Sequence, residues 1–261
     1  MLKEINSRDN NTIKKIRSLQ TRAGRKKSGL FFIEGTRIVD EALSAAPEQI
    51  LFIVISKTYE ETHDLKALEY LKNYDCSIVP DSLFRELSDT ETPQGILAVM
   101  KISGIKANDF SFKEYYVLIL DNVRDPGNIG TILRTAEAMG FDSIFLTKGC
   151  ADIYSPKVLR STMGSVFRIK LYANCDIADI NLLKKNNYSI ISTSLDESSV
   201  ILDAVDTQKK LAVVIGSEAD GVSKELLSIS DIQVKIPMKG KTESLNAAVA
   251  AAIVMYYFSK N

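Results

Sequence analysis

The chain has 261 residues, of which 45% are hydrophobic and 25% charged, and its formal net charge at pH 7 is +0. This composition is typical of a globular protein with one large or two modest domains. The three cysteines, Cys76, Cys150 and Cys175, are widely spaced without a CxxC pair, which argues against a disulfide framework or a zinc site. The N-terminus lacks an apolar signal core, and the longest apolar run, Ala247–Phe258, is too short to span a bilayer. We therefore expect a cytoplasmic protein with reduced thiols.

The neutral total hides a basic N-terminal segment. Residues 1–29 carry nine Lys and Arg against only Glu4 and Asp9. Asn10 or Asn11 caps a predicted helix through Leu19, and the basic stretch Arg22–Gly29 that follows is predicted to be a loop. A basic arm on a neutral protein suggests a polyanionic partner, although a solvated charged surface gives the same pattern.

The rest of the N-terminal part alternates short strands with helices. The predicted strands are Leu30–Glu34, Ile50–Ile55, Ser77–Val79 and Gly95–Lys101, and the predicted helices run from Gly35 through Leu43, over Leu65–Leu71 and over Ser82–Leu87. This pattern predicts a small α/β domain over residues 1–103. Residues 104–114 show no clear periodicity and are interpreted as a linker to a second domain, 115–261.

Strands and helices alternate throughout the second domain. The predicted strands are Tyr115–Asp121, Ser143–Leu146, Val166–Tyr172, Tyr188–Ser192, Leu211–Ile215 and Gln233–Ile236. The predicted helices are Asn128–Met139, one that begins at Pro156, Ile177–Lys185, Lys224–Ser228 and Ser244–Phe258. Such alternation predicts an α/β fold with a mostly parallel sheet and helices on both faces.

Polar loops follow several of these strands, where ligands bind to parallel sheets. The first motif reads Asn122-Val-Arg-Asp125-Pro126-Gly-Asn128-Ile-Gly130 and is followed by Arg134. The second contains Gly216, Glu218 and Gly221, and the third joins Ile236-Pro237-Met238 to Ser244-Leu245-Asn246. These three ordered motifs resemble those of the SpoU/TrmH family of RNA ribose methyltransferases, in the SPOUT superfamily. Ala219 departs from the pattern, since many relatives have glycine there.

The resemblance implies a trefoil knot and the cofactor S-adenosylmethionine, held by knotted loops. It assigns cofactor binding to residues of the second and third motifs and of the loop after Tyr188–Ser192, namely Thr193, Ser194, Leu195, Gly216, Ile236, Met238 and Leu245. It assigns catalysis of methyl transfer to a ribose 2′-hydroxyl to Asn128, Arg134, Glu218, Ser244 and Asn246. No metal is implied.

Arg134 is the proton acceptor proposed in this family, but a guanidinium stays protonated in proteins. We prefer a role in holding a phosphate beside the ribose through two parallel hydrogen bonds. Glu218 is then expected to orient either Arg134 or the asparagine side chains.

The N-terminal segment around Gly29–Leu43 resembles, more loosely, the substrate-binding domain often fused ahead of this catalytic domain. The expected RNA contacts are the basic residues Arg22, Arg25, Lys26, Lys27 and Arg37. By analogy with that domain, ribosomal RNA is favoured over transfer RNA. The helix from Ser244 is apolar all round and needs cover on every side, which together with the resemblance predicts a homodimer through the catalytic domain.

Two other function classes stay open. A non-catalytic RNA-binding protein on the same fold would bind RNA without the cofactor. A nucleotide-hydrolysing enzyme would use Gly240-Lys241-Thr242, but Lys235 stands where a phosphate-binding loop needs glycine. No GxGxxG follows a strand, so a dinucleotide site has no support. His63 is the only histidine, which excludes a metal site made of several histidines.

Overall fold

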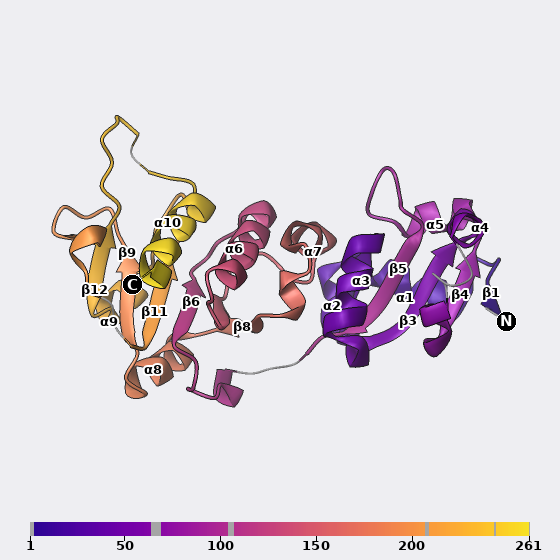
Figure 1. Ribbon diagram of the computed structural model, residues 1–261, viewed down its shortest axis with the longest axis horizontal. Coiled ribbons are helices and arrows are strands. Elements are labelled where there is room, and N and C mark those ends of the chain that lie inside the picture. Colours follow the sequence, from indigo (N-terminus) through magenta and orange to yellow (C-terminus); the bar gives the residue numbers. More distant parts are fainter. Residues whose placement is uncertain (1–2, 64–68, 104–106, 207–208, 243, 261) are drawn as a thin grey trace. The chain divides into compact units, whose positions relative to one another are not determined.

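Two compact units make up the chain in the computed structural model, which describes residues 3–63, 69–103, 107–206, 209–242 and 244–260 (Figure 1). The first unit is Met1–Gly104 with Asp152–Phe167, and the second is Ile105–Ala151 with Arg168–Asn261. Residues 152–167 lie between two strands of the second unit in sequence but pack with the first. The order of elements along the chain does not reveal this division.

The first unit is built on a five-stranded sheet in the order β1-β4-β3-β5-β2. Its strands are β1 (Lys3–Glu4), β2 (Leu30–Glu34), β3 (Ile50–Ser56), β4 (Cys76–Val79) and β5 (Ile96–Lys101). β1, β4 and β3 are parallel, whereas β5 is antiparallel to both β3 and β2. The four longer strands were predicted, and β1 was not because two residues carry no periodic signal.

Helices cover both faces of this sheet. They are α1 (Asn11–Leu19), α2 (Arg22–Ser28), α3 (Thr36–Ala45), α4 (Lys57–Thr62), α5 (Asp81–Leu87) and α7 (Pro156–Thr162). Ile13, Ile16 and Leu19 of α1 are fully buried with Phe84 of α5 in one core cluster. The i, i+3, i+6 spacing of the α1 residues therefore predicted the buried face correctly. Residues 65–68 of the predicted helix Leu65–Leu71 lie outside the described residues, and Glu69–Asn73 form a 3₁₀ helix.

The predicted loop Arg22–Gly29 is wrong, because Arg22–Ser28 form helix α2. Thr21 caps it by accepting a hydrogen bond from the Gly24 backbone N–H at 3.1 Å, and Gly29 ends it in the left-handed region at φ 67°. A Cβ on Gly24 would lie 1.8 Å from the carbonyl oxygen of Ser18, so this glycine permits close packing of α2 against α1. Arg and Lys are good helix formers, which the charge of this segment obscured.

The second unit is a seven-stranded sheet in the order β10-β12-β9-β11-β6-β7-β8, parallel at every pairing. Its strands are β6 (Tyr116–Leu120), β7 (Ser143–Thr147), β8 (Lys170–Cys175), β9 (Ser189–Thr193), β10 (Val200–Ile201), β11 (Leu211–Ile215) and β12 (Ile232–Lys235). The predicted α/β class with a parallel sheet is confirmed. The strand predicted at Val166–Tyr172 is misplaced, since Ser165–Phe167 form a 3₁₀ turn. The implied knot stays a prediction.

The helices that pack on this sheet in the described part of the chain are α6 (Pro126–Ala138), α8 (Ile177–Lys185), α9 (Lys224–Ile229) and α10 (Ala247–Lys260). α6 and α10 lie side by side, and α8 and α9 pack together elsewhere on the sheet (Figure 1). Phe110, within the predicted linker, is 4% exposed and packs its ring against Phe145 and Tyr172 of the core. No helix among the described residues has the length and apolar character needed to cross a membrane.

Candidate active site

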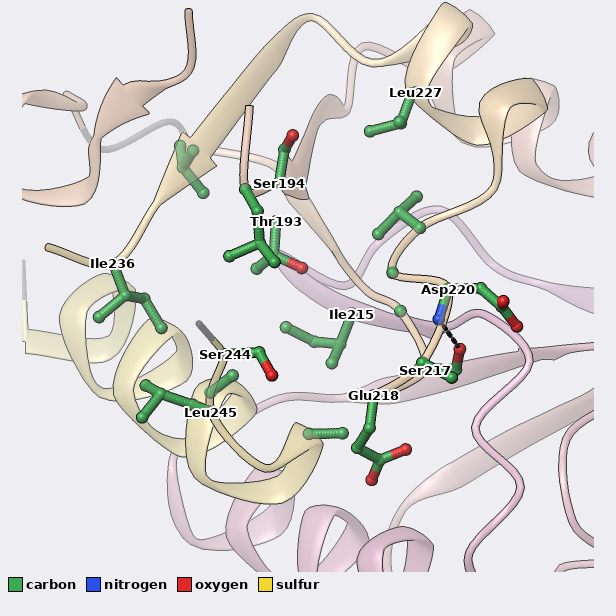
Figure 2. Close-up of a pocket in the computed structure, with 18 of the residues that line it drawn as sticks. Thr193, Ser194, Ile215, Ser217, Glu218, Asp220, Leu227, Ile236, Ser244 and Leu245 are labelled. Atoms are coloured by element: carbon green, nitrogen blue, oxygen red, sulfur yellow. Dashed lines mark hydrogen bonds between the residues drawn. The ribbon is translucent and has the colours of Figure 1, made fainter. Parts of the chain in front are cut away.

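A cavity of about 280 Å³ opens in the second unit near the carboxyl ends of β9, β11 and β12 (Figure 2). Its apolar walls include Ile215, Leu227, Val234 and Ile236, and hydroxyl and carboxylate groups stand at its rim. All seven residues predicted to bind a cofactor line it, namely Thr193, Ser194, Leu195, Gly216, Ile236, Met238 and Leu245. The cavity thus brings together three loops that are far apart in sequence.

The loop after β11 folds back over its own first residue. Ser217 and Gly221 exchange two backbone hydrogen bonds, and Gly221 adopts φ 67°. A Cβ on Gly216 would lie 2.1 Å from the backbone carbon of Gly221 and 2.3 Å from the nitrogen of Val222. Gly216 is therefore required by the tight return of this loop. The family resemblance predicts that Gly216 binds the cofactor. The close approach of the loop backbone is a separate reason for a glycine at this position.

Three predicted catalytic residues form one hydrogen-bonded chain at the rim of the cavity. The side-chain amide of Asn128 donates to a carboxylate oxygen of Glu218, which itself lines the cavity. The side-chain amide of Asn246 donates to Oδ1 of Asn128 at 3.0 Å. The first, second and third motifs are thus joined in the order Glu218, Asn128, Asn246. Glu218 contacts an asparagine, one of the two expected options.

Asn128 and Asn246, the two asparagines of this hydrogen-bonded chain, each lie at the start of a helix. Asp125 caps α6 by accepting from the Asn128 backbone N–H at 2.8 Å, and Pro126 follows at the first position of the helix. Oδ1 of Asn246 accepts from the N–H groups of Ala248 and Val249 at 3.0 and 3.3 Å. This cap explains why α10 begins at Ala247 and not at the predicted Ser244.

A buried carboxylate that the sequence analysis missed anchors the loops from below. Asp121 is 6% exposed, accepts from the Thr147 hydroxyl at 2.9 Å, and accepts from the Ser223 backbone N–H at 2.7 Å. The Thr147 hydroxyl oxygen in turn accepts from the Asn122 N–H at 3.1 Å. Asp121 therefore ties the end of β6 to the end of β7 and to the loop after β11. The signal in the sequence that could have identified Asp121 is its position, as an acidic residue directly after the apolar run of β6.

The two other predicted catalytic residues differ in position. Ser244 lines the cavity and is exposed. Arg134 is an exposed residue of α6 that does not line the cavity, and within the described ranges its side chain has no hydrogen bond or ion pair. The structure therefore does not bring Arg134 into contact with Glu218.

In the described part of the chain, the two cysteines of this unit are buried, and the possible metal ligands do not form a metal-binding group. Cys150 is buried and donates to the Leu120 carbonyl at 3.3 Å, and burial raises its pKa. Burial also raises the pKa of Cys175 to about 12. In the part of the chain that the structure describes, no three His, Cys, Asp or Glu side chains are grouped so that they could hold a metal ion.

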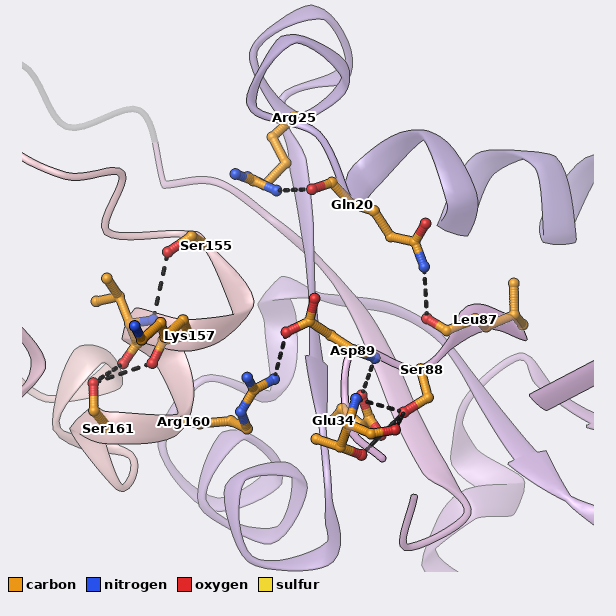
Figure 3. A network of polar contacts seen from close by, with 12 residues as sticks. Gln20, Arg25, Glu34, Leu87, Ser88, Asp89, Ser155, Lys157, Arg160 and Ser161 are labelled. Carbon is orange, nitrogen blue, oxygen red and sulfur yellow. Dashed lines mark hydrogen bonds and ion pairs between the residues drawn. The ribbon is translucent and has the colours of Figure 1, made fainter. Parts of the chain in front are cut away.

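The predicted RNA-contacting residues of the first unit divide into two kinds. Arg22, Lys26, Lys27 and Arg37 are exposed. Arg25 is 5% exposed and donates two hydrogen bonds to Asp152, at 3.0 and 2.7 Å, and one to the carbonyl of Leu19 at 2.6 Å. It donates another to the carbonyl of Gln20 at 3.1 Å (Figure 3). The structure contradicts the expected RNA contact of Arg25. Its buried guanidinium already donates hydrogen bonds to the end of α1 and to Asp152, and so links them to α2.

Known proteins match the chain in both units. Residues 115–256 match the SpoU rRNA methylase family and residues 10–98 match the MRM3-like substrate binding domain. The chain is 33% identical to the 23S rRNA (guanosine(2553)-2′-O)-methyltransferase RlmP of Bacillus subtilis, over 98% of this chain and 99% of that protein. It is 30% identical to human mitochondrial rRNA methyltransferase 3, over 91% of this chain and 69% of that protein.

A solved structure matches with similar completeness. The crystal structure of AdoMet-bound rRNA methyltransferase from Sinorhizobium meliloti superposes with a TM-score of 0.87 at 28% identity, covering 99% of this chain and 98% of that chain. Because the family model covers more than half of the sequence and the B. subtilis relative matches almost end to end, the chain belongs to the SpoU rRNA methylase family.

Proposed function

We propose that the protein is an S-adenosylmethionine-dependent methyltransferase that modifies a ribose 2′-hydroxyl of ribosomal RNA in the cytoplasm. The observation that carries this proposal is the chain Glu218–Asn128–Asn246 at the rim of a cavity lined by every predicted cofactor residue. The names of the B. subtilis and human relatives, both rRNA methyltransferases, support the substrate class.

The cavity fits the cofactor in chemistry. Ile215, Ile236 and Leu245 supply apolar wall for an adenine ring, and backbone polar groups at Ile236, Met238 and Leu245 are the proposed hydrogen-bonding partners of its edge. Bound S-adenosylmethionine supplies an activated methyl group on a sulfonium. No metal is needed for the transfer, which requires alignment of the hydroxyl oxygen with the methyl carbon.

The rim residues are proposed to place the ribose. Glu218 holds Asn128 by one carboxylate oxygen, and Asn246 holds the amide oxygen of Asn128 from the other side, so the Asn128 side chain has a fixed orientation. Ser244 lies on the same rim and offers a hydroxyl to the nucleotide. Arg134 is exposed on α6, and we propose that it takes its place at the site by binding an RNA phosphate.

RNA is proposed to contact the first unit through exposed basic side chains on α2 and at the start of α3. The proposed contacts are Arg22, Lys26, Lys27 and Arg37, without Arg25. Lys and Arg contacts to phosphates release counterions, so the affinity for RNA should fall steeply with salt. Transfer RNA is the alternative substrate, with the same chemistry at the ribose.

We also propose a homodimer through the second unit. α10 buries Ala251, Val254 and Met255 against its own sheet, but Val249, Ile253 and Tyr256 on its other side are 48%, 37% and 55% exposed. Their spacing at i, i+4 and i+7 makes one continuous apolar stripe along the helix. Such a stripe suits an isologous contact with a second copy.

Two measurements test the proposal. Calorimetry should show S-adenosylmethionine binding to the purified protein without magnesium, and ribose-methylation mapping of total RNA should lose one or more ribosomal positions when the gene is deleted. A folded protein that binds RNA but no cofactor at millimolar concentration would instead be the non-catalytic RNA-binding protein.

A further inference from the structure

Arg124 stands in the loop between β6 and α6, four positions before Asn128, and reaches the rim of the cavity. Its Nη2 lies 3.9 Å from a carboxylate oxygen of Asp220, and Asp220 lines the cavity two residues after Glu218. The structure therefore places the guanidinium of Arg124 beside a cavity-lining residue of the second motif. Arg134 makes no such contact among the described residues.

The direction of the Arg124 side chain is set by the loop beneath it. Nε of Arg124 donates to Oδ1 of Asn122 at 3.1 Å. Asn122 adopts φ 56°, in the left-handed region, and its backbone N–H is held by Thr147, which Asp121 holds in turn. Gly149 packs so closely that an added Cβ would lie 2.4 Å from the same Oδ1 of Asn122. A residue with a side chain at position 149 would therefore push the Asn122 amide out of place.

The guanidinium has capacity to bind an anion from solvent. The Arg124 and Asp220 side chains are 70% and 69% exposed, so their ion pair at 3.9 Å is in solvent and contributes at most about 1 kcal/mol. Nη1 of Arg124 has no hydrogen bond to any residue in the described part of the chain. An RNA phosphodiester, which carries one negative charge and offers two non-bridging acceptor oxygens to the planar guanidinium, outcompetes such a pair.

We propose that Arg124 is a substrate-positioning residue, which binds a phosphate of the RNA next to the methylated ribose and exchanges its contact with Asp220 for that phosphate. This inference rests on the proposed function. It adds a residue that acts on the RNA alone, because Arg124 does not line the cavity proposed to hold the cofactor.

The test compares Arg124→Ala and Arg124→Lys with the wild type, using ribosomal RNA purified from cells that lack the gene. Lys185→Ala is the matched control, because Lys185 is an exposed cation of α8 in the same unit and is in no described ion pair. Three quantities are measured: the KM for RNA, the slope of log affinity against log salt, and the affinity for S-adenosylmethionine.

Arg124→Ala is expected to raise the KM for RNA about tenfold and to reduce the salt slope by about 0.7, the value of one phosphate contact. Cofactor affinity should stay unchanged, and Lys185→Ala should match the wild type throughout. Arg124→Lys should keep the salt slope but not the low KM, since lysine cannot bond Asn122 and a phosphate in one plane. Asp220→Asn should lower the KM, because it removes the competing carboxylate.

An Arg124→Ala variant with wild-type KM and wild-type salt slope overturns the inference. That result differs from failure of the proposed function, in which the wild type itself would bind no cofactor and methylate no RNA. A loss of cofactor affinity in Arg124→Ala would also overturn it, by placing the residue in the cofactor pocket.

Discussion

The side-chain amide of Asn128 donates a hydrogen bond to the carboxylate of Glu218, 90 positions later in the chain. The two residues meet because β6 and β11 are adjacent parallel strands whose last residues, Leu120 and Ile215, are paired in register. Both loops therefore leave the same edge of the sheet at the same height. The pairing of the two strands brings Asn128 and Glu218 together. Substitutions can therefore test the effect of this hydrogen bond on catalysis separately from its effect on stability.

Removal of Glu218 should impair turnover with little effect on the fold. Glu218→Ala leaves the Asn128 amide without its acceptor, and the exposed loop loses no core contact. We expect kcat to fall about 10²-fold, the usual cost of a misplaced group at a reacting centre. Glu225→Ala, an exposed glutamate in the first turn of α9, is the control and should retain full activity. Equal kcat for Glu218→Ala and wild type would remove Glu218 from the catalytic set.

Asn246 has two functions that different substitutions separate. Asn246→Asp keeps the cap on α10, because Asp and Asn cap equally well, but it cannot donate to Asn128. We expect an unchanged melting temperature and a strongly reduced kcat. Asn246→Ala should lose the same activity and also about 1 kcal/mol of stability. Full activity in the Asp variant would show that the Asn246–Asn128 bond has no catalytic role.

The sequence predicted those helices and strands whose formation depends on residues close together in the chain. The apolar run Leu211–Ile215 is fully buried because a central parallel strand is covered on both faces, and Pro156 starts a helix because its missing N–H is not needed there. α2 was missed because its stability comes from packing on α1 at Gly24, which the pattern of charges does not show.

The site was predicted through motifs, and the misses are long-range contacts. All seven residues predicted to bind the cofactor line one cavity, because the loops that carry them follow adjacent strands. Arg25 was expected to face RNA because it stands in a basic run, yet its partner Asp152 is 127 positions away. Asp121 was missed for the same reason, since its partners are distant in sequence: Thr147 ends β7, and Ser223 lies in the loop after β11.

Arg25 and its neighbour Lys26 should behave in opposite ways. Arg25→Ala leaves Asp152 and two carbonyl groups without their donor in a buried place, which should destabilise the first unit by about 3–5 kcal/mol. Lys26→Ala should leave stability unchanged and weaken RNA binding, because Lys26 is exposed on the same helix. Chemical unfolding and RNA-binding measurements on both variants test this. A stable Arg25→Ala protein with weakened RNA binding would restore the first expectation.

Alkaline pH should destabilise the protein through its buried thiols. Burial raises the pKa of Cys76 and of Cys175 from 9.0 to about 12 in the folded state. The unfolded chain therefore loses these protons at lower pH than the folded protein. The contribution of the neutral thiols to the free energy of unfolding is fully present below about pH 9 and is lost as pH rises toward 12. Urea unfolding between pH 8 and 11 should show a falling free energy of unfolding. Cys76→Ser should reduce the steepness of this fall, and an equal slope in that variant would contradict the assignment.

Disruption of the apolar stripe on α10 should produce monomers. Ile253 is 37% exposed between Val249 and Tyr256, and Ile253→Asp places a charge at the centre of the proposed contact, where it would be desolvated without a partner. Ile201→Asp is the matched control, because Ile201 is 46% exposed on β10 of the same unit but outside the stripe. Light scattering at micromolar concentration should give the mass of two chains for the wild type and the control, and of one chain for Ile253→Asp. An active wild-type protein with the mass of one chain would show that the stripe has another purpose.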